Sequence, residues 1–594
     1  MVIGIVYLPT LDGDFLHDDY GLAIFTEDGK ASWEEGLRYF FPSHLTRDQF
    51  LRPIPVMAGV LDLAFWGGNP FGFHLTNLLI HLVGALLVGR VAARLARNPR
   101  AGPLAMLCYG LYPGHVESVA WIIHRMVGLC VVFSMLAILL HLRSRWRPLA
   151  WSAALAALLC KEPAAILPAA IAIVHILDTP GGRPWHRVLC AARAAVPYGM
   201  VVGAYLVWKH LAFGSLVTGY GDHDSYFGYF VGEKIYLDIP ASLLRFLSPV
   251  NSEVVPALCV WLHAAVAALG LAALLWYGPG MKQTRSLIFF GGALAVLSLV
   301  LVFPFLSVTG GLTNSRHFSP PAMGLALALG GFLAGLSKRG RVLALVGLAV
   351  YCLPLIRNLA PYQEAGRMAR AVRRGLEKRL AGYPEGTRVL VAGVPAMVNG
   401  ASVFGYGKAL QGALNPPFAS RKLHVEVMAT MDDPTGDPDN VLLTLQGPCT
   451  VLSVVPGSGK GPLEVREVQR ETGALPETVE LLDPIKGATI SLRADPGFVF
   501  RSAREYPYYR LVFKVGPVLF PVTAARGKHV VVEAGGRLVY RLSQGDIHEN
   551  NFLDRSEVSR ISGPVTWWVE GVEDHRLPGS AVVRSRVERF HVGK

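Results

Sequence analysis

Two adjacent carboxylates, Asp18 and Asp19, stand shortly after an apolar N-terminal run in a very hydrophobic chain. At a membrane surface such a pair can serve as a general base or bind a cation, because desolvation and mutual repulsion push the two pKa values apart. A solvated loop is the alternative that two acidic residues alone do not exclude. The pair gains meaning only if other reactive residues reach the same face of the membrane.

The composition is that of a polytopic α-helical membrane protein. Of the 594 residues, 52% are hydrophobic and 17% are charged, which does not describe an ordinary water-soluble protein. The long apolar stretches stop near residue 357, and the remainder has mixed polarity with many Gly and Pro residues. We therefore expect a transmembrane domain at 1–360 and a soluble domain at 361–594.

The net charge of +13 does not indicate nucleic acid binding, because no recognition motif accompanies the basic residues. Many of these residues flank apolar segments, where Lys and Arg set the orientation of a span. Of the seven cysteines, only Cys449 falls in the soluble part, which excludes a disulfide framework there. The charge is therefore interpreted as membrane topology.

Apolar segments of roughly the length needed to span a bilayer alternate with loops of two kinds, and together with the N-terminal run they predict about 11 spans. Loops rich in Lys and Arg are predicted to be cytoplasmic: 90–100, 143–147, 183–193, 282–285 and 338–341. The other loops then lie on the outer face: 12–52, 114–124, 161–162, 211–253 and 307–317. The soluble domain would also lie outside the cytoplasm.

This topology counts the run from Val2 to Leu11 as a first span, although it is only about half the length that a span needs. A signal peptide is the competing interpretation. The run has neither a basic beginning nor a small-residue cleavage site before Asp12, so a truncated or misassigned first helix is favoured.

Three further groups of reactive residues fall on the predicted outer face. His115 and Glu117, two residues apart, can reach the same cavity from a helix end. Lys161 and Glu162 form a predicted ion pair between two apolar helices, which is either structural or functional. Arg316 stands at the outer mouth of a late span, and its planar guanidinium suits phosphate recognition because it can bind two oxygens at once.

The order of these motifs resembles the membrane part of the transmembrane, tetratricopeptide-containing O-mannosyltransferases, which belong to the GT-C class of glycosyltransferases. The motifs are Asp-Asp, Arg-Pro, Asn-Pro-x-Gly-x-His-x-x-Asn-x-x-x-His, Pro-x-His-x-Glu-x-Val-Ala-Trp, Lys-Glu and a late Arg before a Pro. The resemblance covers roughly residues 10–335. It implies transfer of a sugar from a polyprenyl-phosphate donor to an acceptor on the non-cytoplasmic face, with inversion at the anomeric carbon.

The chemistry of such a transfer agrees with the residues. A carboxylate must remove the acceptor proton, and Asp18 or Asp19 is placed for this role; which of the two remains open. The lipid phosphate leaves as a stable anion and needs positive charge, for which Arg316 is the first candidate and Lys161 the second. The remaining candidates, which would orient the base or the sugar hydroxyls, are His115, Glu117 and Glu162.

Two other possibilities were weighed for the polar residues. His74 and His81 lie seven residues apart on one helical face, which is more typical of hydrogen bonding between helices than of catalysis. Asp18, Asp19, His115 and Glu117 could also ligate a metal, and the sequence does not exclude a divalent ion. Because GT-C enzymes with lipid-monophosphate donors generally do not depend on a bound metal, we expect no obligatory cofactor.

The soluble domain is expected to begin with an amphipathic basic helix at 362–381, followed by a β-rich fold, either a sandwich or a sandwich preceded by a small α/β portion. The strands are predicted at 387–395, 441–456, 487–493, 509–523, 528–542 and 580–592. No 34-residue helical repeat is visible, which leaves a protein acceptor in doubt. Trp567 and Trp568 are interpreted as strand aromatics and not as part of an oligosaccharyltransferase motif.

The sequence therefore predicts a bacterial inner-membrane glycosyltransferase with a periplasmic C-terminal domain. Its expected partners are membrane lipids, a polyprenyl-phosphate-linked sugar and a protein or glycolipid acceptor, and nucleic acid is not among them. One alternative is a transferase of the same fold that acts only on glycolipids, as aminoarabinose transferases do. Another is a non-enzymatic component of lipid-linked glycan transport or assembly, in which the polar clusters form a transit site. Only the enzyme requires an indispensable Asp18 or Asp19.

Overall fold

The computed structural model divides into a helical unit and a β-rich unit. The helical unit comprises Met1–Ala369, Met397–Val403 and Asn415–Ser420, and the β-rich unit comprises Arg370–Ala396, Phe404–Leu414 and Arg421–Lys594. The structure describes residues 1–27, 29–41, 51–96, 98–178, 184–213, 234–303, 306–383, 388–405, 407–419, 426–431, 450–455, 464–467, 477–483, 489–490, 497–515, 518–525, 530–533, 537–541, 563–572 and 581–592.

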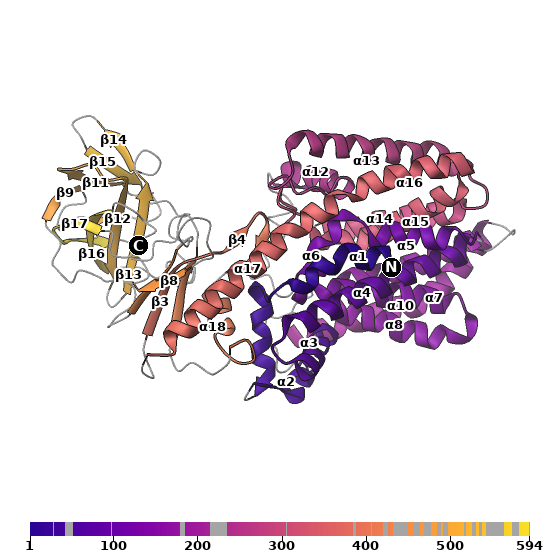
Figure 1. Ribbon diagram of the computed structural model, residues 1–594, viewed down its shortest axis with the longest axis horizontal. Helices are drawn as coiled ribbons and strands as arrows, with labels where there is room; N and C mark the ends of the chain where they lie inside the picture. The colour runs from indigo at the N-terminus through magenta and orange to yellow at the C-terminus, as the bar shows by residue number, and fades with distance from the viewer. Residues whose placement is uncertain are drawn as a thin grey trace. The chain divides into compact units, whose positions relative to one another are not determined.

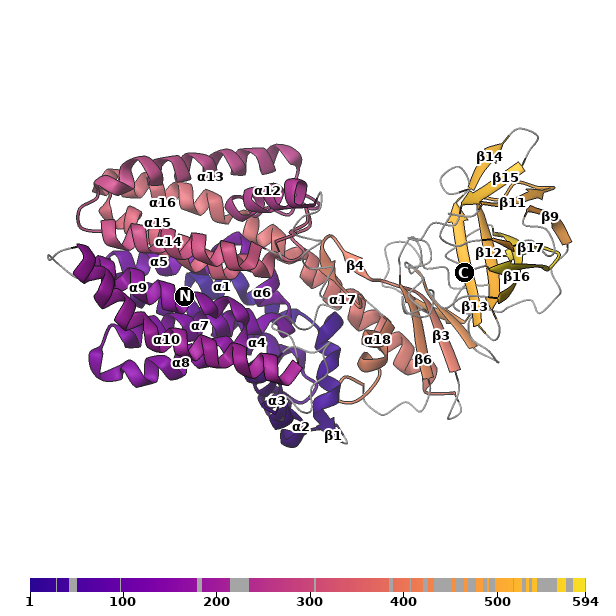
Figure 2. The ribbon, with the colours of Figure 1, turned by 180° about the vertical axis from the view of Figure 1, so that it is seen from behind.

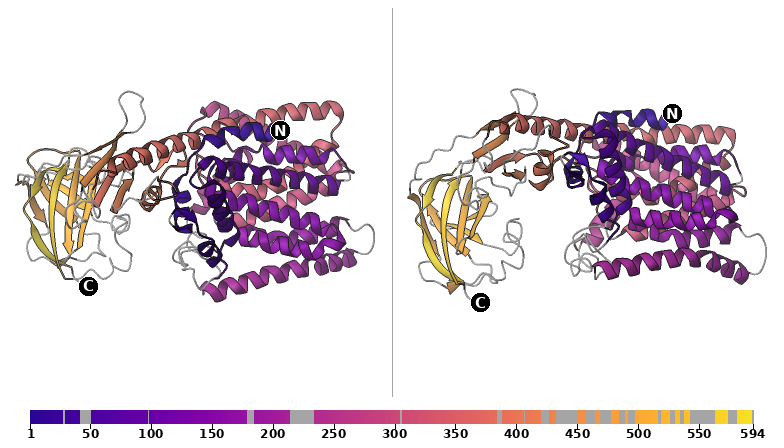
Figure 3. Two further views of the ribbon diagram at one scale, coloured as in Figure 1. Left: turned by 60° about the horizontal axis from the view of Figure 1, so that its bottom comes forward. Right: turned by 90° about the horizontal axis from the view of Figure 1, so that it is seen from below.

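The helical unit is that of a multi-pass membrane protein. In the described residues, seven helices are long and apolar enough to cross a membrane, and four shorter apolar helices accompany them. The predicted total of about 11 spans is therefore not confirmed. The long helices run roughly parallel to one another (Figures 1, 2 and 3). The helices of this unit are α1 Val2–Tyr7, α2 Trp33–Arg38, α3 Pro53–Trp66, α4 Pro70–Ala96, α5 Ala101–Gly110, α6 Val116–Ala120, α7 Arg125–His141, α8 Arg147–Cys160, α9 Leu167–Asp178, α10 Pro184–Phe213, α12 Lys234–Leu247, α13 Ala257–Tyr277, α14 Arg285–Val302, α15 Ser319–Gly335 and α16 Lys338–Cys352.

Small residues bring the central helices of the bundle into close contact. A Cβ atom on Gly291 of α14 would lie 2.4 Å from the backbone nitrogen of Ala328 in α15. A Cβ atom on Gly324 of α15 would lie 2.3 Å from the backbone nitrogen of Ala295 in α14. Glycine allows the two backbones to approach because it lacks this atom. Helix α15, which begins at Ser319 shortly after Arg316, is thereby packed closely against α14.

Helix α3, which begins at Pro53, was not among the predicted helices. Proline is tolerated in the first turn of a helix, where its missing N–H would have no helical partner. The helix is joined to α7 by a buried ion pair in which Arg125 Nη1 donates to Asp62 Oδ2 at 2.5 Å. Removing one partner of such a pair would leave a buried charge, at a cost of about 3–5 kcal/mol. The pair thus holds α3, which directly follows Arg52, against α7.

Short 3₁₀ helices build the loops that the sequence places on the outer face. They tighten the chain into turns and present side chains at defined positions. Those that carry predicted site residues are η2 His17–Phe25, η4 Pro113–His115, η7 Glu162–Ile166 and η10 Ser315–Phe318.

The predicted basic amphipathic helix is confirmed as the second half of α17, Pro354–Leu380. Its apolar side is buried at Val372, Leu376 and Leu380, at intervals of four residues, while the side chain of Arg367 is 70% exposed. This spacing places the buried residues on one face of the helix. The helix begins in the helical unit and ends in the β-rich unit.

The β-rich unit contains a small α/β portion, as one of the sequence alternatives predicted. Its four-stranded sheet has the order β6-β3-β7-β8, in which β3 pairs parallel with β6 and β7, and β7 pairs antiparallel with β8. The elements are β3 Arg388–Val394, α18 Gly407–Ala413, β6 Glu426–Met431, β7 Thr450–Val455 and β8 Glu464–Glu467.

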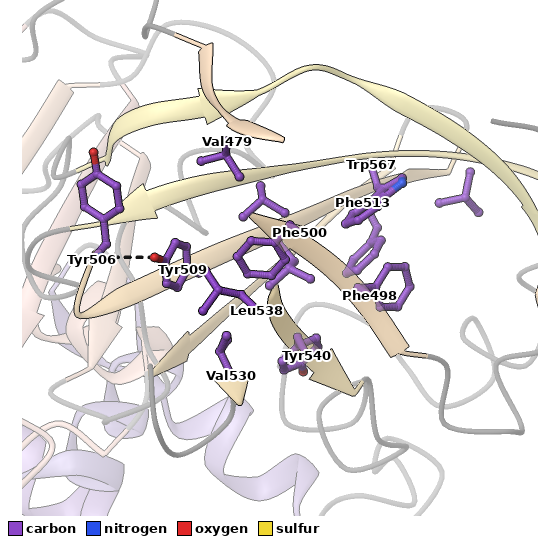
Figure 4. Close-up of a cluster of buried hydrophobic side chains, with 13 residues drawn as sticks. Val479, Phe498, Phe500, Tyr506, Tyr509, Phe513, Val530, Leu538, Tyr540 and Trp567 are labelled. Atoms are coloured by element: carbon purple, nitrogen blue, oxygen red, sulfur yellow. Dashed lines mark hydrogen bonds between the residues drawn. The ribbon is translucent and has the colours of Figure 1, made fainter. Parts of the chain in front are cut away.

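The larger sheet of this unit has ten strands among the described residues. Aromatic side chains form its core, and Figure 4 shows Phe498, Phe513 and Trp567 packed together. Trp567 is fully buried, which confirms it as a strand aromatic. The strands are β9 Glu477–Asp483, β10 Thr489–Ile490, β11 Gly497–Ser502, β12 Tyr508–Val515, β13 Val518–Ala525, β14 Val530–Glu533, β15 Arg537–Arg541, β16 Gly563–Val572, β17 Ala581–Ser585 and β18 Glu588–Val592.

Candidate functional site

Asp18 and Asp19 have different surroundings although they are neighbours. Asp19 is fully buried, and its two oxygens accept hydrogen bonds from the backbone N–H groups of Leu16 at 2.9 Å and Ile123 at 2.7 Å. Burial raises the pKa of Asp19 to about 8, and the two N–H donors oppose this shift. Asp19 thus joins the first predicted outer loop to the second and is inaccessible to solvent.

Asp18 is accessible, since 45% of its side chain is exposed. Its Oδ1 atom lies 3.0 Å from Nδ1 of His17. The backbone of His17 has a φ of 42°, in the left-handed region that residues other than glycine seldom adopt, and its ring packs edge-on against Trp121 at 5.4 Å. Of the two carboxylates, Asp18 is the one that is accessible from solvent.

Glu117 and Arg316, which the sequence placed on the same face, are in direct contact. Nη1 of Arg316 donates to Oε1 of Glu117 at 2.7 Å, and the backbone N–H of Arg316 donates to Oε2 at 2.8 Å. The Glu117 side chain is 1% exposed and that of Arg316 is 23% exposed. Glu117 therefore fixes both the backbone and the guanidinium of Arg316, which keeps an accessible edge for a ligand.

His115 does not share the surroundings of Glu117, contrary to the expectation that both reach one cavity. It is fully buried, and its Nδ1 lies 2.9 Å from Oγ of Ser319, which in turn lies 2.8 Å from Oγ of Ser118. Its ring also packs against Tyr109 at 4.5 Å. These contacts join the second outer loop to the start of α15, and a role of His115 in orienting a substrate stays a prediction.

The prediction that Lys161 and Glu162 form an ion pair is wrong, because Glu162 pairs with other cations. Oε2 of Glu162 accepts from Nη2 of Arg52 at 2.9 Å, and Oε1 lies 3.5 Å from Nζ of Lys209. Lys161 has an extended backbone, with φ at −165°, which turns its side chain away from that of the next residue. Among the described residues, the structure shows no ion pair for Lys161.

Arg52, Lys161, Lys209, Arg316, Glu117 and Glu162 together form what we call the cation cluster. Lys161 is 5% exposed and lies within electrostatic range of Arg52, Arg316 and Glu162, which connects the two ion-paired groups. Burial, together with repulsion from Arg52 and Arg316, lowers the pKa of Lys161 to about 7. The cluster places four basic side chains beside two carboxylates, largely out of water. The excess of positive charge favours the binding of an anion.

The sequence analysis missed Arg52 and Lys209 as members of this cluster. Lys209 follows a stretch of α10, residues 194–208, that contains no charged side chain, and a cation within such an apolar stretch is itself a signal of function. His124 was also missed. Its Nδ1 lies 3.7 Å from Oε1 of Glu117, its ring packs on Trp121 at 4.3 Å, and it lies within electrostatic range of His17, Lys161 and Arg316. It thus lies between the loop of Asp18 and the cation cluster.

A metal site is not evident in the described residues, where no group of three or more His, Cys, Asp or Glu side chains could hold an ion. The described oxygens of Asp19 and Glu117 are instead engaged by N–H groups.

The chain matches no family model. It has low TM-scores against two solved membrane transferases, which do not establish a shared fold. For ArnT from Cupriavidus metallidurans bound to undecaprenyl phosphate, the TM-score is 0.44 at 14% identity, covering 76% of this chain and 92% of that one. For the oligosaccharyltransferase from Archaeoglobus fulgidus in complex with Zn and sulfate, it is 0.38 at 12% identity, covering 71% and 63%.

Similarity to curated proteins is confined to part of each chain. The protein O-mannosyl-transferase Tmtc2 of Drosophila melanogaster is 33% identical over 181 residues, which make up 27% of this chain and 19% of the relative. TMTC4 of Homo sapiens is 29% identical over 199 residues, or 27% of each chain. The chain thus spans about a fifth to a quarter of the length of these relatives. Over that part, it is similar to protein O-mannosyl-transferases, as the order of its motifs indicated.

Proposed function

We propose that this protein is an inverting glycosyltransferase that moves a sugar from a polyprenyl-phosphate donor to an acceptor on the non-cytoplasmic face of the membrane. The observation that carries the proposal is the buried cation cluster next to the loop of the accessible carboxylate Asp18. A single displacement at the anomeric carbon needs these two features, a base for the acceptor hydroxyl and positive charge for the departing phosphate. The partial similarity to O-mannosyl-transferases supports the same chemistry.

In this proposal Asp18 takes the proton of the acceptor hydroxyl while the oxygen of that hydroxyl attacks the anomeric carbon. The bond between that carbon and the phosphate oxygen breaks, and the lipid phosphate leaves as an anion beside Arg316 and Lys161. Both cations exist before the reaction and are held by protein contacts, so they need no reorganisation when charge develops on the leaving oxygen. Asp19, Glu117 and Glu162 keep the surrounding loops and cations in place.

The C-terminal β-rich unit is proposed to lie on the same, periplasmic side of a bacterial inner membrane and to position the acceptor. The basis is the excess of Lys and Arg in the opposite loops. The acceptor is a protein hydroxyl or a glycolipid.

Turnover with a defined donor tests the proposal. The purified full-length protein is supplied with a panel of polyprenyl-phosphate sugars and with peptide or glycolipid acceptors, and glycosylated product is followed by mass spectrometry. We expect product with at least one donor, carrying the anomeric configuration opposite to that of the donor. Binding of donors without any turnover across the panel would instead indicate a component of glycan transport.

Replacing Glu117 by Gln tests how the arginine is held. The amide offers one acceptor where the carboxylate offers two, so either the backbone N–H or the guanidinium of Arg316 loses its partner. A hydrogen bond to a charged group contributes about 1.5–3 kcal/mol. We therefore expect polyprenyl phosphate to bind about 10- to 100-fold more weakly, measured by titration in detergent. Glu34→Gln, at a side chain that is 77% exposed, is the matched control. Equal affinity of both variants would show that Glu117 does not support the site.

A further inference from the structure

A short segment from the C-terminal half of the chain is part of the helical unit. The segment Met397–Val403 follows β3, yet it belongs with Met1–Ala369. It forms a two-stranded antiparallel hairpin in which β4, Met397–Val398, pairs with β5, Ala401–Ser402. Ala401 and Val403 are fully buried. The hairpin is therefore packed into the unit that holds the candidate site.

One end of the hairpin contacts the loop that precedes Arg316. Oγ1 of Thr313 donates to the carbonyl of Gly400 at 2.9 Å. The side-chain amide of Asn251 donates both to the carbonyl of Asn399 at 2.9 Å and to that of Gly311 at 3.1 Å. Asn251 is itself buried, so these contacts have no competing water at its amide. The hairpin turn and the arginine loop are thus bonded directly and through a shared partner.

The turn residue cannot be replaced by another amino acid without a clash. Gly400 has a φ of 85°, and a Cβ atom on it would lie 2.0 Å from the carbonyl oxygen of Gly311. That neighbour is backbone and cannot move aside as a side chain could. Glycine at this position is explained by both the positive φ and the close approach of the two backbones.

The other end of the hairpin contacts the loop that carries the carboxylate pair. The backbone N–H of His17 donates to the carbonyl of Val403 at 2.7 Å. His17 is the residue with the unusual φ of 42°, and Asp18 follows it directly. A backbone in a rarely populated conformation persists only where its surroundings hold it. The hydrogen bond to the Val403 carbonyl is one of the contacts that hold the backbone of His17.

We infer that the hairpin Met397–Val403 is a positioning element that fixes the loop of Asp18 relative to the loop of Arg316. The inference rests on the proposed function of these two residues. The seven residues of the hairpin carry no charge and no general acid or base, so the hairpin contributes position and not chemistry. Misplacing a reacting group by about 1 Å can reduce turnover on the order of 100-fold. The C-terminal half of the chain would thus complete the catalytic unit as well as carry an accessory domain.

Gly400→Ala tests the inference in the full-length protein. Pushing the hairpin off Gly311 is expected to lower kcat about 30- to 100-fold, while KM for the active donor changes less than about threefold, because the cations of the cluster remain. Gly67→Ala is the matched control: Gly67 also has a positive φ, of 58°, but a Cβ atom there meets nothing within 4 Å. Thr313→Val, which removes one hydrogen bond and adds no bulk, should give a smaller loss of kcat and serves as the second variant if Gly400→Ala fails to fold.

Hydrogen exchange provides a second measurement that does not depend on turnover. In Gly400→Ala or Thr313→Val, amides of residues 13–19 and 309–317 should exchange at least about tenfold faster, and in Gly67→Ala they should not. Faster exchange in both segments supports the inference even if the wild-type protein transfers no sugar, an outcome that would contradict only the proposed function. Unchanged exchange in both segments, or a loss confined to donor KM, would overturn the inference.

Discussion

Asp18→Asn is expected to reduce the rate of sugar transfer about 100- to 10,000-fold, because an amide cannot take the proton of the acceptor hydroxyl. The side chain is accessible, unlike that of Asp19, and the substitution preserves its shape. Donor binding should be nearly unchanged, because the phosphate is held by the cation cluster. The expected signature is therefore a fall in kcat with a donor affinity close to that of the wild type.

Two controls separate this effect from a general disturbance of the loop. Glu27→Gln removes an exposed carboxylate from the same loop and should leave the rate unchanged. Asp19→Asn replaces one of the oxygens that bind the Leu16 and Ile123 N–H groups, so it should disturb the position of the loop as well as the rate. Full transfer in Asp18→Asn together with a lost rate in Asp19→Asn would move the base to Asp19.

The second large effect is expected at Lys161, where donor binding should depend on pH. The pKa of this buried ammonium is lowered to about 7, so the free protein loses that positive charge as the pH rises through this value. A polyprenyl-phosphate sugar is a phosphodiester that keeps one negative charge over the same range. Its affinity should therefore be highest below pH 7 and fall above it, as the attraction from Lys161 disappears.

Lys161→Met should remove this dependence. At pH 6 the variant is expected to bind a polyprenyl-phosphate mannose probe about 10- to 100-fold more weakly than the wild type, whereas at pH 8.5 the two affinities should converge. Lys161→Arg keeps its charge and should bind equally at both pH values. Titrations in detergent at three pH values would measure this. A wild-type affinity independent of pH would contradict the assignment of Lys161 to the phosphate.

Much of the helical unit could be predicted because its signal is local. Apolar runs at 72–89 and 254–277 correspond to α4 and α13, and the basic loops between such runs indicate topology. Helix α3 was missed because two prolines mark either a break or a helix start, and only the packing of Asp62 on Arg125 decides between them. Parts of two predicted strands, at 441–449, 487–488 and 491–493, lie outside the described residues.

The sequence indicated which types of residue form the candidate site, but not which of the charged residues pair with each other. The contact of Glu117 with Arg316 joins two motifs on the same predicted face, whereas the partners of Glu162 lie in distant segments. Neighbouring opposite charges suggested the pair of Lys161 with Glu162, and the extended backbone of Lys161 separates the two side chains. The hairpin Met397–Val403 carries no charged residue and therefore no sequence signal of its place beside the site.

The most direct test of the central claim is the initial rate of transfer, measured side by side for the wild type, Asp18→Asn, Asp19→Asn and Arg316→Ala across a panel of polyprenyl-phosphate sugars. The account predicts product from the wild type with at least one donor, a loss of turnover with retained donor binding in Asp18→Asn, and a loss of donor binding in Arg316→Ala. Undiminished transfer by both aspartate variants would contradict it.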